Sequence, residues 1–261
     1  MAKAVEKKKP SLLNRIITWI LVVIIIGATA MLVPELYALY REWQLKHNYN
    51  SMVVHDAGDG EVIIDPDWEQ LKAQNEDIVA WIAVPNTPIN YPILQGPDNE
   101  FYLDHASNKE KNKFGSIFLD SKANPDFSDD NTLIYGHNVS GNNSMFSKLT
   151  NFLNPEFFQA NPNFYILTPN GKFQCQILTV NRLLDSSKSY QTQFNNPQQV
   201  VDLVEQNRAE AQLKSEVPFE LGDKLVTLST CDLNFGLESE HRIILTAKLV
   251  AYEGEVKMKI T

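Results

Sequence analysis

Residues 224–231 read KLVTLSTC, a run rich in β-branched and aliphatic residues that ends in a cysteine. This composition favours a β-strand, and the stretch DLNFG at 232–236 that follows is typical of a loop. The pattern therefore predicts that Cys231 ends a strand, where its side chain can face a cleft. The next apolar run, 242–250, begins with Arg242. Two strands joined by such a loop can pair antiparallel, which would bring Arg242 close to Cys231.

Short apolar or alternating runs recur along most of the chain and predict a mainly β protein, either a barrel or a sandwich. The expected strands are 81–84, 89–94, 116–119, 131–135, 163–168, 172–183, 224–230 and 242–250. Helical spacing from Trp68 through Leu71, Ile78 and Val79 predicts a helix after Asp67. Two short helices are expected near 144–152 and 154–159. A longer one is expected over 197–213, with Pro197 in its first turn and Asn196 as its cap.

An uncharged apolar run near the N-terminus predicts a membrane anchor. Residues 16–33 hold no charged side chain, and a membrane-spanning helix needs roughly 20 apolar residues. We expect a cytoplasmic tail at 1–15, a transmembrane helix at 16–36, a stalk at 37–65 and a catalytic domain at 66–261. The basic residues of the tail predict that the rest of the chain lies outside the cell. The alternative is a signal peptide cleaved near 27–30.

Charge and cysteine content exclude several classes of function. The chain has a net charge of −9, and its N-terminal tail is basic, so the remainder is strongly acidic. An acidic body argues against nucleic acid as a partner, because phosphate binding needs a basic face. The two cysteines allow one disulfide at most, and their spacing matches no metal-binding motif.

The two cysteines differ in their predicted surroundings. Cys175 lies within the apolar alternation of 172–183, which favours a buried structural thiol, whereas Cys231 ends its strand. A nucleophilic thiol needs a partner that favours the thiolate, and His137 also follows an apolar strand. Arg242 is the arginine best placed to stabilise an oxyanion. On the residues alone, a buried cysteine, a solvated histidine and an arginine capping a strand end remain open as alternatives.

These residues together resemble the signature of the sortase family. The resemblance rests on Thr227-Leu228-Ser229-Thr230-Cys231, on the upstream Tyr135-Gly136-His137-Asn138, on Arg242 and on the N-terminal anchor. The stretches 90–96 and 115–120 are similar to class B sortases in particular, as is a long helix-containing insertion at about 184–222. The resemblance implies an eight-stranded β-barrel with short helices.

The resemblance also implies an activity and a set of site residues. It implies a membrane-anchored cysteine transpeptidase in which Cys231 attacks a C-terminal sorting signal, LPxTG- or NPxTx-like, at the Thr–Gly or equivalent bond. His137 and Arg242 would assist, and an amine of a peptidoglycan precursor would receive the acyl group. Family patterns suggest four substrate-groove residues, for which ordinary barrel packing is the alternative: Asn90, Leu94, Tyr190 and Ser229. No cofactor and no metal are implied.

Three other functions compete with this interpretation. A pilin polymerase would use a lysine amine of another pilin as acceptor. A non-catalytic surface module would bind a ligand and leave Cys231 inert. A papain-like hydrolase would place its cysteine early in the domain with histidine far downstream, whereas here His137 precedes Cys231, so we reject this third possibility.

Overall fold

The structure is a computed structural model that describes residues 11–139, 141, 143–236 and 239–259. The chain divides into two compact units, Met1–Gln44 and Leu45–Thr261. The first ten residues of the expected cytoplasmic tail lie outside the described residues. The second unit begins before residue 66, so residues 45–65 of the expected stalk belong to it.

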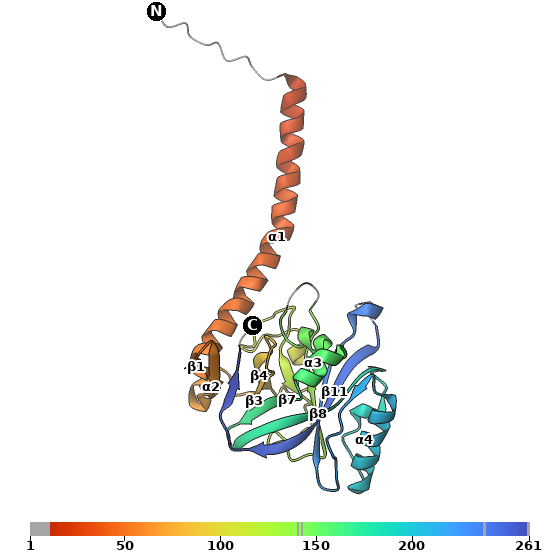
Figure 1. The fold of residues 1–261 in the computed structure, drawn as a ribbon. Coiled ribbons are helices and arrows are strands. Elements are labelled where there is room, and N and C mark those ends of the chain that lie inside the picture. Colours follow the sequence, from red (N-terminus) through yellow and green to blue (C-terminus); the bar gives the residue numbers. More distant parts are fainter. Residues whose placement is uncertain (1–10, 140, 142, 237–238, 260–261) are drawn as a thin grey trace, which may run out of the picture. The chain divides into compact units, whose positions relative to one another are not determined.

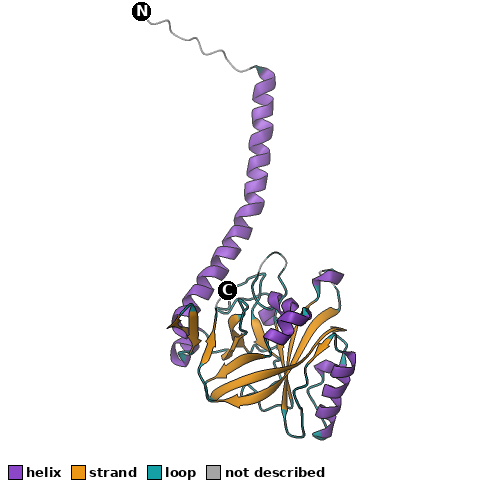
Figure 2. Ribbon diagram, in the orientation of Figure 1, coloured by secondary structure: helices purple, strands orange, loops and turns teal. Residues whose placement is uncertain are grey.

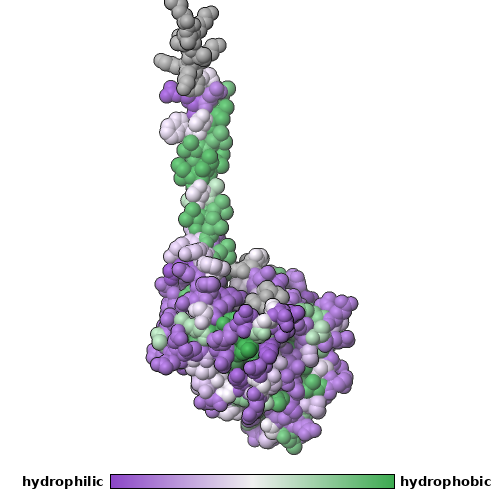
Figure 3. Space-filling view, turned by 60° about the vertical axis from the view of Figure 1, so that its left-hand side comes forward, coloured by the Kyte–Doolittle hydropathy of each residue, from purple (hydrophilic) through white to green (hydrophobic). Residues whose placement is uncertain are grey.

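A long helix, α1 (Leu12–Val53), contains the apolar run near the N-terminus (Figure 1). Its apolar side chains from Leu12 to Leu36 are largely exposed, as the green surface of the helix in Figure 3 shows. By length and composition this is the one helix of the described residues that could cross a membrane. At 1.5 Å per residue, an 18-residue apolar run is about 27 Å long, close to the thickness of a bilayer core.

The second unit is built on a closed β-barrel (Figures 1 and 2). Eight strands follow one another around it, and the pairing of β8 with β11 closes the ring, with β9 (Leu213–Lys214) added to the edge of β8. The eight strands, in chain order, are β3 (Ile78–Ala83), β4 (Asn90–Leu94), β5 (Ile117–Leu119), β6 (Asn131–Tyr135), β7 (Asn163–Thr168), β8 (Gly171–Leu184), β10 (Lys224–Cys231) and β11 (His241–Tyr252). The predicted mainly β fold and its eight-stranded barrel are confirmed.

Apolar side chains fill the barrel and the space around it. Trp81, Phe118, Phe164 and Leu228 are among the fully or almost fully buried residues. A second apolar cluster joins α4 (Gln198–Glu210) to β8 and β10 through Val204, Leu178 and Leu225. The helix-containing insertion is therefore packed onto the strand that carries Cys231.

Several predicted helices differ from the observed ones. The helix after Asp67 is α2 (Trp68–Gln74), which Asp67 caps through the backbone N–H of Gln70, and Ile78 and Val79 belong to β3 instead. The segment near 144–152 forms a 3₁₀ helix, η2 (Ser147–Leu153), and α3 spans Pro155–Ala160. Helix α4 begins at Gln198, so Pro197 lies at the N-cap position and not in the first turn, although Asn196 still accepts a hydrogen bond from the N–H of Gln199. The helix ends at Glu210, because Leu213 pairs with β8.

A small three-stranded sheet completes the second unit. It consists of β1 (Val54–Gly58), β2 (Glu61–Ile64) and β12 (Val256–Met258), none of which the sequence pattern predicted. Tyr49 and Val53, at the end of α1, are buried in the same apolar cluster as Ile64. The last turns of α1 and this sheet therefore extend the core of the second unit. The remaining short elements are the 3₁₀ helices η1 (Phe101–Leu103), η3 (Lys188–Tyr190) and η4 (Leu233–Phe235).

Candidate active site

Two neighbouring strands bring the cysteine and the histidine to the same edge of the barrel. Strand β6 runs parallel to β10, with Tyr135 opposite Ser229. His137 lies two residues beyond Tyr135, and Cys231 lies two residues beyond Ser229. Because parallel strands end at the same edge, both side chains are carried to one side of the barrel.

The arginine comes from the strand on the other side of β10. Strand β11 runs antiparallel to β10, and Cys231 pairs directly with Arg242. In an antiparallel pair, directly opposite residues project their side chains to the same face. The antiparallel arrangement predicted from the loop between these strands is therefore observed.

A cavity of about 440 Å³ collects these residues. Its walls come from β5, β6, β10, β11 and the loops that precede β5 and α4. The lining residues are Asn99, Leu103, Phe118, Tyr135, Gly136, His137, Asp185, Tyr190, Ser229, Thr230, Cys231 and Arg242. The cavity is mixed in character, with aromatic and apolar walls around a few polar groups, which is typical of ligand sites.

The backbone around Cys231 is tied to the histidine strand. The side-chain amide of Asn138 donates a hydrogen bond to the carbonyl of Cys231 over 2.9 Å, and the N–H of Gly136 donates to the carbonyl of Ser229 over 3.2 Å. These bonds hold the ends of β6 and β10 together beyond their regular pairing. Asn138 thus has a positioning role that the sequence pattern did not reveal.

The two cysteines have the contrasting surroundings that the sequence suggested. Both thiols are free, and Cys231 is half-buried at the cavity. Cys175 is fully buried in β8, and this burial raises the pKa of its thiol well above the ordinary value. A neutral buried thiol behaves as a small apolar side chain, so Cys175 is part of the barrel core.

The ring of His137 is oriented by the backbone of a distant loop. Its Nε2 lies 2.7 Å from the carbonyl oxygen of Leu103, and since a carbonyl can only accept, Nε2 is the donor. The neutral ring then carries its proton on Nε2 and leaves Nδ1 unprotonated. His241, the histidine that directly precedes Arg242, is the alternative candidate for the catalytic histidine. Its ring is stacked on that of Phe235, with 3.8 Å between ring centroids.

Gly136 allows close packing and not the sharp turn that its position in the sequence suggests. We expected it to allow a sharp turn before His137, yet its backbone does not adopt a left-handed conformation. Instead, a Cβ atom at this position would lie 2.7 Å from the ring of Phe146. Close packing of the histidine segment against Phe146 is therefore the reason for glycine.

The guanidinium of Arg242 is held by one carboxylate and two backbone carbonyls. Its Nη2 lies 3.1 Å from Oδ2 of Asp185, and its Nη1 donates to the carbonyls of Ser239 and His241. Arg182 takes part in a different ion pair, 3.1 Å from the buried carboxylate of Asp232. Of these two arginines, Arg242 is the one that lines the cavity.

Of the four predicted substrate-groove residues, the structure brings two to the cavity. The hydroxyls of Tyr190 and Ser229 are 2.6 Å apart, and the ring of Tyr190 stacks on that of Tyr135 with 6.4 Å between centroids. Burial is the main cause that raises the pKa of Tyr190, and the Tyr135 pKa is raised by burial and then by the charge of Asp120. The phenol hydroxyls of Tyr190 and Tyr135 therefore remain neutral hydrogen-bonding groups at physiological pH.

Asn90 and Leu94 lie elsewhere, which corrects their predicted assignment. Asn90 is 2% exposed and accepts a hydrogen bond from the indole N–H of Trp81, and Leu94 is fully buried. Both belong to the core around β4. The cavity wall on this side is instead formed by Asn99 and Leu103, loop residues that no sequence pattern singled out.

Among the described residues, no group of three His, Cys, Asp or Glu side chains is arranged to hold a metal ion.

Comparison with known proteins agrees with this geometry. Residues 82–250 match the profile of the Sortase domain family. The chain belongs to the sortase family. It is 32% identical over 187 residues to sortase B of Staphylococcus aureus, an alignment that covers 72% of this chain and 76% of the relative. It is 34% identical over 180 residues to sortase B of Listeria monocytogenes, covering 69% and 72% of the two chains.

Solved structures extend the similarity to the whole barrel. A structure of the Staphylococcus aureus sortase B–substrate complex superposes with a TM-score of 0.67 at 29% identity, covering 82% of this chain and 94% of that one. Sortases are cysteine transpeptidases, and this chain is a member of the family similar to sortase B. The recognition made from Cys231, His137 and Arg242 is therefore confirmed at the level of family and enzyme class.

Proposed function

We propose that this sortase cleaves a C-terminal sorting signal through an acyl-enzyme on Cys231 and transfers the cleaved protein to an amine of the cell wall. The observation that carries the proposal is the convergence of Cys231, His137 and Arg242 on one cavity. The similarity to a Staphylococcus aureus sortase B that has been solved as a substrate complex supports substrate binding by this chain. The cavity offers such a peptide the neutral hydroxyls of Tyr190 and Ser229.

The first half-reaction forms a thioester. His137 takes the proton of the Cys231 thiol on Nδ1, which gives a thiolate and an imidazolium. The thiolate sulfur attacks the carbonyl carbon of the threonine in the signal, and the oxyanion that develops is stabilised by the Arg242 guanidinium. The C–N bond breaks, and the imidazolium donates its Nδ1 proton to the leaving amine.

The second half-reaction transfers the acyl group. The incoming amine attacks the thioester carbon, loses a proton to Nδ1 of His137 and releases Cys231 as the leaving thiolate, with Arg242 again beside the oxyanion. Arg242 cannot act as a base, because a guanidinium stays protonated at any relevant pH. Asp185 holds the guanidinium in place through the 3.1 Å contact.

Residues 16–36 form the proposed membrane anchor, with the N-terminus in the cytoplasm and the barrel outside the cell. The apolar, exposed side chains of α1 in this segment support insertion in a bilayer. External protease added to intact cells should remove the barrel and leave the tail protected. Protection of the barrel in this assay would contradict the orientation.

The substrate and acceptor are tested together. The barrel unit from Leu45 onward is incubated with NPxTx- and LPxTG-like peptides and with two acceptors, a peptidoglycan-precursor amine and a lysine-containing pilin peptide, and products are identified by mass. We expect a Cys231 thioester and transfer to the precursor amine. Transfer to the pilin lysine alone would favour a pilin polymerase, and intact peptides with an unlabelled Cys231 would favour a non-catalytic module.

A further inference from the structure

Gly115 lies where the loop before β5 passes beneath the ring of His137. Its φ of +58° is in the left-handed region. A Cβ atom built on Gly115 would lie 2.6 Å from the carbonyl oxygens of Tyr102 and Leu103 and 2.9 Å from Cδ2 of His137. Contacts this short are not tolerated, so any side chain here must displace either the two carbonyls or the histidine ring. The obstacle is therefore the catalytic ring itself and the backbone that holds it.

The Leu103 carbonyl that limits the space at Gly115 is also the acceptor for Nε2 of His137, at 2.7 Å. The ring is thus held by a hydrogen bond at Nε2, and its Cδ2 edge occupies space that a side chain on residue 115 would need. This hydrogen bond decides which nitrogen is free. With Nε2 donating to Leu103, only Nδ1 can exchange protons with the cysteine and the substrate.

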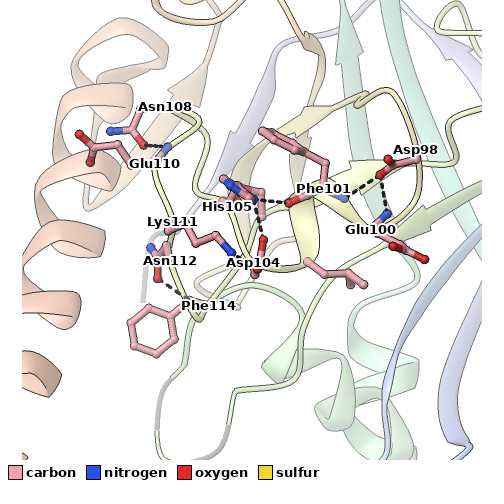
Figure 4. Close-up of polar contacts among 12 residues, drawn as sticks. Asp98, Glu100, Phe101, Asp104, His105, Asn108, Glu110, Lys111, Asn112 and Phe114 are labelled. Carbon is pink, nitrogen blue, oxygen red and sulfur yellow. Dashed lines mark hydrogen bonds and ion pairs between the residues drawn. The ribbon is translucent and has the colours of Figure 1, made fainter.

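The start of the loop that carries this carbonyl is rigidly bonded (Figure 4). We call residues 98–115 the positioning loop. The carboxylate of Asp98 accepts hydrogen bonds from the N–H groups of Glu100 (2.9 Å) and Phe101 (2.8 Å). The His105 ring stacks on Phe101 with 4.1 Å between centroids, and its Nδ1 lies 2.7 Å from the Phe101 carbonyl. These contacts form around η1, the single turn that ends at Leu103.

The end of the positioning loop is bonded back onto the same turn. Lys111 forms an ion pair with Asp104 at 2.9 Å, and the N–H of Asn112 donates to the Asp104 carbonyl over 2.8 Å. The N–H of Gly115 in turn donates to the Asn112 carbonyl over 2.9 Å. Gly115 and the Leu103 carbonyl are therefore held in one hydrogen-bonded unit.

We propose that Gly115 is a positioning residue for His137. Because Gly115 has no side chain, the ring can approach the Leu103 carbonyl and donate its Nε2 hydrogen to it. The positioning loop fixes this carbonyl, so that Nδ1 is directed toward the thiol and the substrate. The inference rests on the proposed function for its kinetic consequence, but the state of the ring can be measured without any substrate. It assigns a catalytic purpose to a loop that contributes no reacting atom.

The test compares Gly115→Ala with Gly222→Ala. Gly222 also has a left-handed φ, +93°, but a Cβ there meets no atom within 4 Å, so this control reproduces the backbone strain without the contact. For Gly115→Ala we expect kcat to fall about 10- to 100-fold, as misplacement of a catalytic group by about 1 Å can cause, with a smaller change in KM and a displaced pH–rate profile. Gly222→Ala should keep the wild-type kinetics.

A spectroscopic readout separates this inference from the proposed function. Imidazole ¹⁵N NMR of the neutral His137 ring should report the Nε2–H tautomer in the wild type and a mixture of tautomers in Gly115→Ala. Should Gly115→Ala not fold, Asp98→Ala provides the same test by loosening the positioning loop without adding volume. The proposal would be overturned if the wild-type His137 ring were in the Nδ1–H form. It would also be overturned if a folded variant kept both the wild-type tautomer and the wild-type kinetics. Absence of transpeptidation in the wild type would refute only the proposed function.

Discussion

Cys175 and Cys231 lie on strands of the same barrel, and their positions along those strands give them opposite properties. Cys175 is in the middle of β8, fully buried, with a raised pKa. Cys231 ends β10, half-buried, beside a cavity that His137 and Arg242 also line. A strand interior shields a thiol from solvent, whereas a strand end can combine a rigid backbone with access to solvent and to other strand ends. The position of a cysteine along its strand thus separates a core thiol from a reactive one.

The largest expected effect comes from replacing each cysteine by alanine, which removes its sulfur. Cys231→Ala should abolish acyl transfer, because no other nucleophile replaces the sulfur in the thioester. Cys175→Ala should keep most of the activity, since it removes only a buried sulfur. A thiol-specific reagent should label the folded wild type at Cys231 alone. Equal loss of activity in two well-folded variants would show that strand position does not distinguish a core thiol from the nucleophile. A Cys175–Cys231 disulfide in active protein would also contradict this assignment, because it would consume the nucleophile.

The second effect tests what distinguishes the end of β10 chemically. His137→Ala should be nearly as damaging as Cys231→Ala, because it removes both the base for the thiol and the acid for the leaving amine. His241→Ala is the matched control: its ring stacks on Phe235 and does not line the cavity. Steady-state transpeptidation of both variants decides the matter. An inactive His241→Ala beside an active His137→Ala would reassign the histidine.

The third effect concerns charge stabilisation after attack has begun. Loss of one oxyanion donor typically costs about 10²–10³ in rate, or about 2.7–4 kcal/mol. Arg242→Ala should therefore lose about that much, and Arg242→Lys somewhat less, because lysine keeps the charge but not the planar fork. Labelling of Cys231 by a small thiol reagent should persist in both.

The control for Arg242→Lys is Arg208→Lys on α4, where the guanidinium pairs with Glu205 at 2.8 Å, away from the cavity. Arg182 is a poor control, because its ion pair with the buried Asp232 lies next to the nucleophile in sequence. Wild-type turnover in Arg242→Ala would remove this arginine from the reaction and make Arg182 the next candidate.

The strand pattern was sufficient to locate the strands and to put Cys231, His137 and Arg242 at strand ends, whereas the barrel and the roles of these residues came from the family resemblance. All eight expected strands overlap the eight strands of the barrel, because their apolar runs and turn residues are local signals. The closure of β8 on β11 and the small sheet of β1, β2 and β12 were beyond such reasoning, since they depend on pairing between distant segments.

The substrate wall shows where local signals fail. Every residue of β4 is buried, so no polar–apolar alternation reveals which of its side chains face a cavity. Asn90 was placed in the groove by its match to a family pattern, although its amide is bonded to Trp81 within the core. Asn99 and Leu103 reach the cavity from the positioning loop, whose course is set by hydrogen bonds within the loop (Figure 4) and by those that link Asn99 to Asp120 and Ser121, and not by any periodicity.

The smallest expected effect leaves activity untouched and concerns the stability that depends on Cys175. Its folded pKa is raised by burial, while in the unfolded chain the thiol has a pKa of about 8.5. Above that pH the unfolded chain releases a proton that the folded barrel retains, so the unfolded state gains. The free energy of unfolding should hence be unaffected by this thiol below about pH 8.5 and fall by about 1.4 kcal/mol for each further pH unit.

Denaturant unfolding of wild type and Cys175→Ala at pH 7.5, 8.5 and 9.5 measures this term as the difference between the two pH slopes. Subtracting the variant removes the contribution of the tyrosines and of Cys231, which both proteins share. The wild type should lose about 1 kcal/mol more than the variant between pH 8.5 and 9.5. Parallel slopes would mean that Cys175 ionises as easily in the barrel as in the unfolded chain. The contrast between a shielded thiol in mid-strand and a reactive one at a strand end would then rest on position alone.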